Sequence, residues 1–172
     1  LAGTFTPEAD VNPQGGRDGS GGFNNAEGVV DAGYGVGLFG AQAYDLTDPL
    51  NPVPMGDELW RTTGTTAGTV FVKEVRPGTS GSYCSQFCQA GTLMYFQAND
   101  GTIGQELYFA NGVPEGQPGH SFGLAADLFP GGTWDSGTPQ YITYSGKGKI
   151  VFSGRDGIVL GGWGGTQAVP HL

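Results

Sequence analysis

The chain has few basic residues: Lys and Arg number 7 against 16 Asp and Glu, which gives a net charge of −9. Lys and Arg form no cluster, so the chain lacks the electrostatic footprint of a nucleic-acid-binding protein. The same charge disfavours anionic membrane surfaces. No apolar run reaches the roughly 18 residues that a transmembrane helix needs. We therefore expect neither nucleic acid nor membrane as a partner.

Cysteine and histidine are equally scarce, with two of each. Cys84 and Cys88 cannot complete a zinc site by themselves, because such a site takes four ligands. Their spacing is also wider than the C-x-x-C of thiol redox proteins. We predict a local disulfide between them, as is common in secreted proteins. The alternative is two reduced, half-buried thiols.

The motifs of common catalytic sites are missing as well. The sequence has neither a G-x-S-x-G nucleophile elbow nor a P-loop. A glycosidase needs two carboxylates roughly 5–10 Å apart, and no motif places Asp100 near Asp156, or Glu58 near Glu106. We predict that the protein is not an enzyme, and a glycoside-acting enzyme is the weakest of the three functions considered.

Glycine and proline are abundant, at 34 and 11 residues, and aromatic residues make up 12% of the chain. Disordered chains are poor in aromatic residues, so this composition indicates an all-β fold with many glycine-rich turns and no long helix. We expect a turn at Asn99-Asp100-Gly101, a turn of the tight hairpin type at Asn111-Gly112, and a proline-rich connector over 48–54. The expected strands are 29–30, 34–38, 41–44, 58–61, 69–75, 92–98, 105–110, 122–128, 140–144, 149–153 and 158–160.

Short motifs recur along the chain at spacings of about 50 residues, a period typical of β-propeller blades. The recurring groups are Pro77-Gly78 with Pro130-Gly131, Asp100-Gly101 with Asp156-Gly157, and Glu58-Leu59-Trp60 with Glu106-Leu107-Tyr108. The chain holds only two to three such units, whereas propellers close with typically 4–8 blades. The pattern predicts repeated antiparallel units, arranged either as propeller blades or as a sandwich, that are completed by something else.

Residues 56–112 resemble the ELW-x-x-x-GT-x-AGT repeats of large secreted bacterial proteins. The resemblance depends on Glu58-Leu59-Trp60, Gly64-Thr65, Ala67-Gly68-Thr69, Val72-Lys73, Pro77-Gly78, Tyr95-Phe96 and Asn99-Asp100-Gly101. Residues 121–157 match more weakly, and no match is found in residues 1–50. The resemblance implies secretion and propeller-like or stacked β units, and it implies no catalytic residues.

The N-terminal residues 1–22 are polar and rich in glycine and proline, and we expect them to form an extended arm before an all-β repeat domain at 23–172. The arm contains a sequence similar to a calcium loop, in which alternate residues direct oxygen atoms to one centre. The candidate ligands are Asp10, Asn12, Gln14 and Asp18. Gln14 replaces an acidic ligand and no glutamate closes the loop, so a solvated turn-rich arm is the competing interpretation.

These observations lead to two hypotheses of different classes. The first is a secreted structural subunit that associates with copies of itself into an extracellular filament or surface layer, because open sheet edges pair with other chains. Its expected subunit contacts are Leu1, Phe5, Trp163 and Leu172. The second is a calcium-assisted carbohydrate-binding or adhesion module, in which Trp134 and Trp163 stack on a sugar or contact a protein partner.

Overall fold

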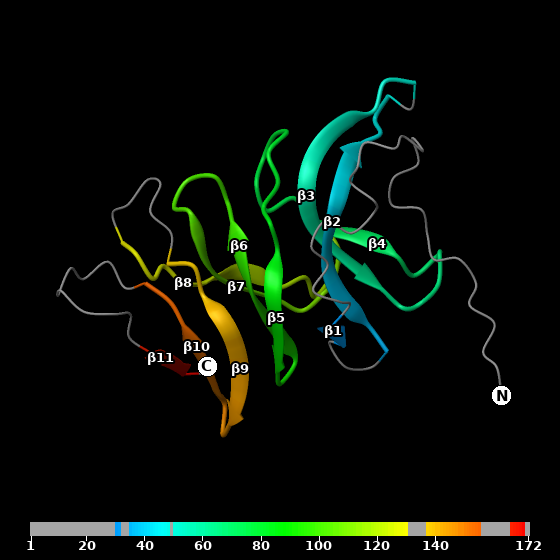
Figure 1. The fold of residues 1–172 in the computed structure, drawn as a ribbon. Helices are drawn as coiled ribbons and strands as arrows, with labels where there is room; N and C mark the ends of the chain where they lie inside the picture. The colour runs from blue at the N-terminus through cyan, green and yellow to red at the C-terminus, as the bar shows by residue number, and fades with distance from the viewer. Residues whose placement is uncertain (1–29, 32–34, 49, 131–136, 156–165, 171–172) are drawn as a thin grey trace, which may run out of the picture.

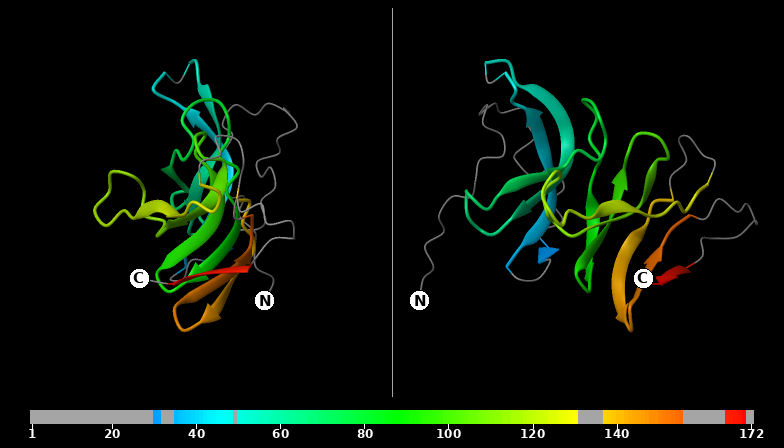
Figure 2. Two further views of the ribbon diagram at one scale, coloured as in Figure 1. Left: turned by 90° about the vertical axis from the view of Figure 1, so that its left-hand side faces the viewer. Right: turned by 180° about the vertical axis from the view of Figure 1, so that it is seen from behind.

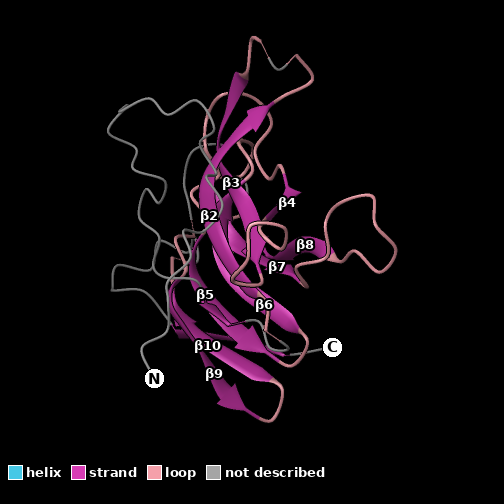
Figure 3. Cartoon of the chain, turned by 90° about the vertical axis from the view of Figure 1, so that its right-hand side faces the viewer, coloured by secondary structure: helices cyan, strands magenta, loops and turns pink. Residues whose placement is uncertain are grey.

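The structure, a computed structural model, describes residues 30–31, 35–48, 50–130, 137–155 and 166–170. Its described residues form strands and loops without a helix (Figure 3). This confirms the prediction of an all-β fold with repeated antiparallel units. The strands are β1 (Val30–Asp31), β2 (Gly37–Asp45), β3 (Val53–Thr62), β4 (Val70–Lys73), β5 (Ser85–Ala90), β6 (Leu93–Asn99), β7 (Gln105–Ala110), β8 (Phe122–Ala126), β9 (Gln140–Gly146), β10 (Lys149–Ser153) and β11 (Thr166–Pro170).

The strands form three antiparallel sheets, each built from consecutive strands. The first sheet has the order β1-β2-β3-β4, the second β5-β6-β7-β8, and the third β11-β10-β9. The second sheet lies between the other two (Figure 1). Contacts between sheets join β1 and β2 to β5, and β5 and β6 to β9. The three sheets therefore follow one another in a row, with the first strand of each sheet beside that of the next.

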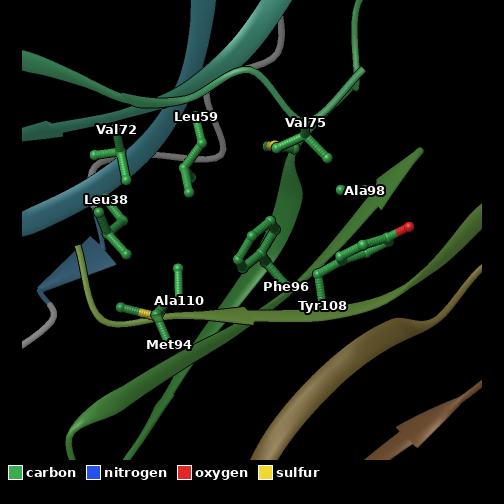
Figure 4. Packing of buried hydrophobic residues seen from close by; sticks show 10 residues of the cluster. Leu38, Leu59, Val72, Val75, Met94, Phe96, Ala98, Tyr108 and Ala110 are labelled. Carbon is green, nitrogen blue, oxygen red and sulfur yellow. The ribbon is translucent and has the colours of Figure 1, made fainter. Parts of the chain in front are cut away.

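The hydrophobic core lies between the sheets rather than within one of them. Figure 4 shows side chains of the first sheet, among them Leu59, facing Phe96 and its neighbours on the second sheet. The second and third sheets share another cluster, which includes Leu107, Ile150 and Phe152. Because the second sheet is covered on both faces, five consecutive residues of β6 are buried, and this strand has no apolar-polar alternation.

Two of the expected turns have different outcomes. The Asn99-Asp100-Gly101 turn is confirmed: the Asp100 Oδ1 accepts hydrogen bonds from the Thr102 and Ile103 amides at 2.8 and 3.1 Å. The prediction of a tight hairpin turn at Asn111-Gly112 is wrong, since β8 begins only at Phe122. Asn111 instead closes a longer loop, because its Oδ1 accepts the Ser121 amide at 3.1 Å.

Two strands lie where the sequence did not predict any. The β5 strand, Ser-Gln-Phe-Cys-Gln-Ala, is too polar to read as a strand by itself, but it pairs with β6 in the second sheet. The β11 strand pairs with β10 over five residues. The predicted proline-rich connector also ends early, since β3 begins at Val53 and includes Pro54. Proline is tolerated there because the ladder between β2 and β3 has an irregularity at Ala43/Tyr44.

The predicted disulfide between Cys84 and Cys88 is wrong, because both cysteines are free. Ser85 pairs with Gln97 and Cys88 with Tyr95, so three steps along β5 oppose two along β6. Such a bulge reverses which face the following side chains point to. Cys84 accordingly belongs to the cluster between the first and second sheets, whereas Cys88 packs on the cluster between the second and third.

Candidate functional site

The described residues contain two fully buried carboxylates, Glu58 on β3 and Glu106 on β7. Both belong to the recurring Glu-Leu-aromatic motif. The strand ladders place them equivalently, because Glu58 lies opposite Ala41 in the first sheet and Glu106 lies opposite Ala98 in the second. A repeated buried acid needs compensating hydrogen bonds, since an ion or polar group without partners is costly to bury.

Those hydrogen bonds come from the segments that leave each sheet. The Glu58 Oε2 accepts the Val75 amide at 2.6 Å and the Arg76 amide at 3.2 Å. The Glu106 Oε2 accepts the Leu128 amide and its Oε1 accepts the Gly137 amide, both at 2.7 Å. We call these segments the first junction (residues 75–82) and the second junction (residues 128–130 and 137–138). Each glutamate thus holds one junction against its own sheet.

Backbone hydrogen bonds attach the first junction to both neighbouring sheets. The Ser82 amide donates to the Asp57 carbonyl at 2.7 Å, and the Asn99 amide donates to the Ser82 carbonyl at 2.8 Å. The approach is close enough to require glycine, because a Cβ on Gly56 would lie 2.4 Å from the Gly81 nitrogen. The first junction therefore connects β3 of one sheet to β6 of the next.

The second junction repeats this arrangement. The Thr138 amide donates to the Gln105 carbonyl at 2.9 Å, and the Arg155 amide donates to the Gly137 carbonyl at 2.7 Å. A Cβ on Gly137 would lie 2.4 Å from the Leu128 Cβ. The two recurring glutamates and the two junctions thus form one repeated structural device between successive sheets.

Burial changes the acid-base properties of this device. Removal from water raises the pKa of Glu58 from 4.5 to about 7, against the lowering effect of the Val75 and Arg76 amides. Burial likewise raises the pKa of Glu106. The Glu58 Oε1 is buried without a hydrogen-bond partner, and protonation removes the charge that makes such burial costly. These properties fit a structural acid between sheets.

A surface groove of 630 Å³ lies beside the long hairpin of β2 and β3, and neither glutamate lines it. Its walls are residues 44–47 and 53–55 of the hairpin, together with Glu74, Gly78 and Thr79 of the loop after β4. Leu46 and Val53 line it and are about half exposed, at 47% and 53%, and Leu50 on the same hairpin is 89% exposed. The groove thus combines exposed apolar side chains with the carboxylates of Asp45 and Glu74.

Most of the binding residues predicted from the sequence lie outside the described residues. These are the calcium-loop residues Asp10, Asn12, Gln14 and Asp18, the contact residues Leu1, Phe5, Trp163 and Leu172, and the stacking residue Trp134. Trp60, the remaining tryptophan of the chain, is half-buried and lies edge-on to Phe71, with 5.6 Å between the ring centroids. In the described part of the chain, no three His, Cys, Asp or Glu side chains are grouped to hold a metal ion.

A sequence similarity within residues 1–50, where no match to the repeat was found, could have extended the predicted repeat toward the N-terminus. Gln42-Ala43-Tyr44-Asp45-Leu46-Thr47 shares four identities with Gln97-Ala98-Asn99-Asp100-Gly101-Thr102. In both turns the aspartate Oδ1 accepts the threonine amide, at 2.9 Å for Asp45 and 2.8 Å for Asp100. The similarity is hidden because the β2–β3 hairpin is longer, which moves the turn away from the glutamate.

Comparisons with known proteins return no match: no family model, no curated protein and no solved structure is similar to this chain at a significant level. Among the described residues, no helix is long and apolar enough to cross a membrane.

Proposed function

We propose that this protein is a secreted structural subunit that associates with copies of itself into an extracellular filament or surface layer. The observation that carries the proposal is the exposed surface of the third sheet, which ends the row of sheets. In the third sheet, Tyr141 is 77% exposed, and Thr143, which pairs with Val151 on the face opposite Ile142, is exposed as well. In β9 only Ile142 is buried, whereas β6 of the second sheet is buried on both faces.

The other end of the row carries residues of the kind that bind a sheet. Phe39 pairs with Trp60 on the first sheet as Phe96 pairs with Tyr108 on the second. In the second sheet, Phe96 and Tyr108 pack against the first sheet. In the first sheet, Phe39 and Ala41 form a separate cluster with Trp60 packed on it. The first sheet thus carries Phe39 and Trp60 on the side away from the second sheet. These residues correspond to Phe96 and Tyr108, with which the second sheet packs on the first.

These two ends support a head-to-tail contact in which the first sheet of one copy extends the row of its neighbour. A contact between two different surfaces propagates into a filament when the rotation between copies does not close a ring. Phe39 and Ala41 are 2% and 1% exposed in the subunit. Because these side chains are already covered within one subunit, two preformed faces cannot simply dock through them. We therefore favour an assembly in which neighbouring subunits exchange the segment that covers this face.

The extracellular location rests on the resemblance to secreted repeat proteins and remains part of the proposal. The two free thiols remove the disulfide as an argument for an oxidising compartment. The calcium-assisted binding module is the second candidate, but its predicted residues lie outside the described part of the chain.

Electron microscopy of the native material, with and without a calcium chelator, tests the proposed function. We expect regular filaments or layers whose repeat matches the size of one subunit. Loss of order on chelation would assign the Asp10–Asp18 loop a role in assembly. Single compact particles in both conditions, confirmed by light scattering at increasing protein concentration, would contradict self-association and favour the binding module.

A further inference from the structure

We infer that the groove beside the β2–β3 hairpin receives the β9–β10 hairpin of a second copy of this chain, with exposed lysines of one copy facing carboxylates of the other. This inference rests on the proposed self-association and assigns one of its contacts. The two hairpins lie at opposite ends of the molecule, the β2–β3 tip at the top of each view and the β9–β10 turn at the bottom (Figure 2).

The groove side of this contact is acidic and apolar. Its lining contains Asp45 and Glu74 and no Lys or Arg. Asp48, on the same hairpin, is held in its charged form because hydrogen bonds from Asn51 and Leu50 lower its pKa. The exposed Leu46 and Val53 add apolar surface to these charges. A segment that fits the groove should therefore carry positive charge beside apolar or aromatic atoms.

The β9–β10 hairpin has this combination. Lys147 lies in its turn with φ 53°, Lys149 begins β10, and both side chains are exposed. The aromatic residue Tyr144 is 44% exposed on β9 of the same hairpin. The turn is short, because Gly146 already pairs with Lys149. A narrow hairpin with two lysines and a tyrosine is a suitable insert for a groove of 630 Å³.

The distribution of charge makes this hairpin the positive end of an acidic molecule. Of the other basic residues in the described part, Arg61 and Arg76 are half-buried and Lys73 pairs with Glu115. Arg155 is the remaining exposed basic residue there. Copies with a net charge of −9 repel one another, so a contact that places Lys147 and Lys149 against carboxylates offsets part of that repulsion. Because the two surfaces differ, the contact is head-to-tail and can propagate.

A charge-swap experiment on the full chain tests this contact. Lys147→Glu with Lys149→Glu should weaken assembly at least about tenfold, measured as the protein concentration at half assembly in light scattering, since two ion pairs are replaced by repulsion. Asp45→Lys with Glu74→Lys should weaken it similarly. An equimolar mixture of the two double variants should restore heterologous contacts between unlike copies. Arg155→Glu is the matched control and should assemble like the wild type.

Cross-linking provides a second measurement that does not depend on reversed charges. In a Cys88→Ser background, mixing Val53→Cys and Lys147→Cys variants under mild oxidation should yield covalent dimers, whereas a mixture in which Arg155→Cys replaces Lys147→Cys should not. If the wild type assembles, but the lysine swap behaves like Arg155→Glu and the Val53–Lys147 cross-link is absent, this contact is overturned while the proposed function stands. A wild-type chain that stays monomeric at every concentration overturns both.

Discussion

Glu58 and Glu106 show how single residues connect the sheets. Each is the first residue of a motif that the sequence repeats, and each is fully buried where one sheet meets the segment leading to the next. Their carboxylates accept hydrogen bonds from backbone amides that lie outside the strands and have no partner in a strand ladder. This explains why an acid occupies a core position. The recurrence of the motif thus reflects the need to hold each junction in place.

The raised pKa of Glu58 predicts a pH-dependent stability. Its pKa of about 7 in the folded state exceeds 4.5 in the unfolded chain, so protonation favours folding. This contribution is fully present below pH 4.5 and is lost as pH rises to about 7, and it amounts to at most ~3 kcal/mol. Glu58→Gln retains an amide-accepting oxygen and does not titrate. We expect the free energy of unfolding of the wild type to fall relative to Glu58→Gln between pH 4.5 and 7.

Urea unfolding of both proteins across this range measures the difference. Glu115→Gln is a suitable control, because Glu115 is about half exposed. Parallel stability curves for the wild type and Glu58→Gln would show that Glu58 is ionised to the same extent in the folded and unfolded chain.

The two thiols are expected to differ in reactivity. Burial raises the pKa of Cys84 to about 12. Burial also raises the pKa of Cys88, but this thiol is only half-buried and keeps access to solvent. Since the thiolate is the reactive form, an aromatic disulfide reagent should modify Cys88 slowly and Cys84 only after unfolding. Titration in denaturant without reductant should yield both thiols. A titre of zero there would restore the disulfide predicted from the sequence.

At the scale of elements, the packing between neighbouring sheets buries large apolar side chains. Phe96 on β6 is fully buried, stacks on Phe87 at 5.2 Å between ring centres, and lies in the cluster shared with the first sheet. Phe96→Ala removes a large side chain from a region closed by two sheets and should cost about 3–5 kcal/mol. Leu124→Ala on β8, where the side chain is 41% exposed, should cost under about 1 kcal/mol.

Thermal and urea unfolding of both variants provide this comparison. Similar losses for the two substitutions would mean that the cluster between the first and second sheets is not the main source of stability. A loss confined to Phe96→Ala would support the arrangement of sheets in a row.

At the scale of the whole molecule, charge and architecture act in opposite directions. The row of sheets offers two different ends, which favours addition of further copies, whereas a net charge of −9 opposes it. Screening shortens the range of that repulsion to about 8–10 Å at physiological salt. Self-association through the sheets should therefore strengthen with added salt, whereas the contact between the lysine hairpin and the acidic groove should weaken, so the salt dependence separates the two contributions.

Sequence patterns predicted the elements best where local preference and tertiary context agree. The β-branched and aromatic stretches around Val70–Lys73, Leu93–Asn99 and Gln105–Ala110 are strands as expected, and Asp100 with Gly101 forms the expected turn. The polar β5 and the proline-containing start of β3 were missed, because their strand conformation depends on pairing with β6 and β2. Pairing partners distant in sequence leave no local signal.

The amino-acid sequence by itself determined the all-β class, the turn at Asp100-Gly101 and the repeat, because turn residues and runs of β-formers act through near neighbours in the chain. Only the tertiary structure decided which faces are buried, since that depends on one sheet covering the next. The bulge in β5 separates Cys84 from Cys88, and the segments that follow β4 and β8 fold over Glu58 and Glu106. The groove likewise exists because the loop carrying Glu74 folds beside a hairpin about 20 to 30 residues earlier in the chain.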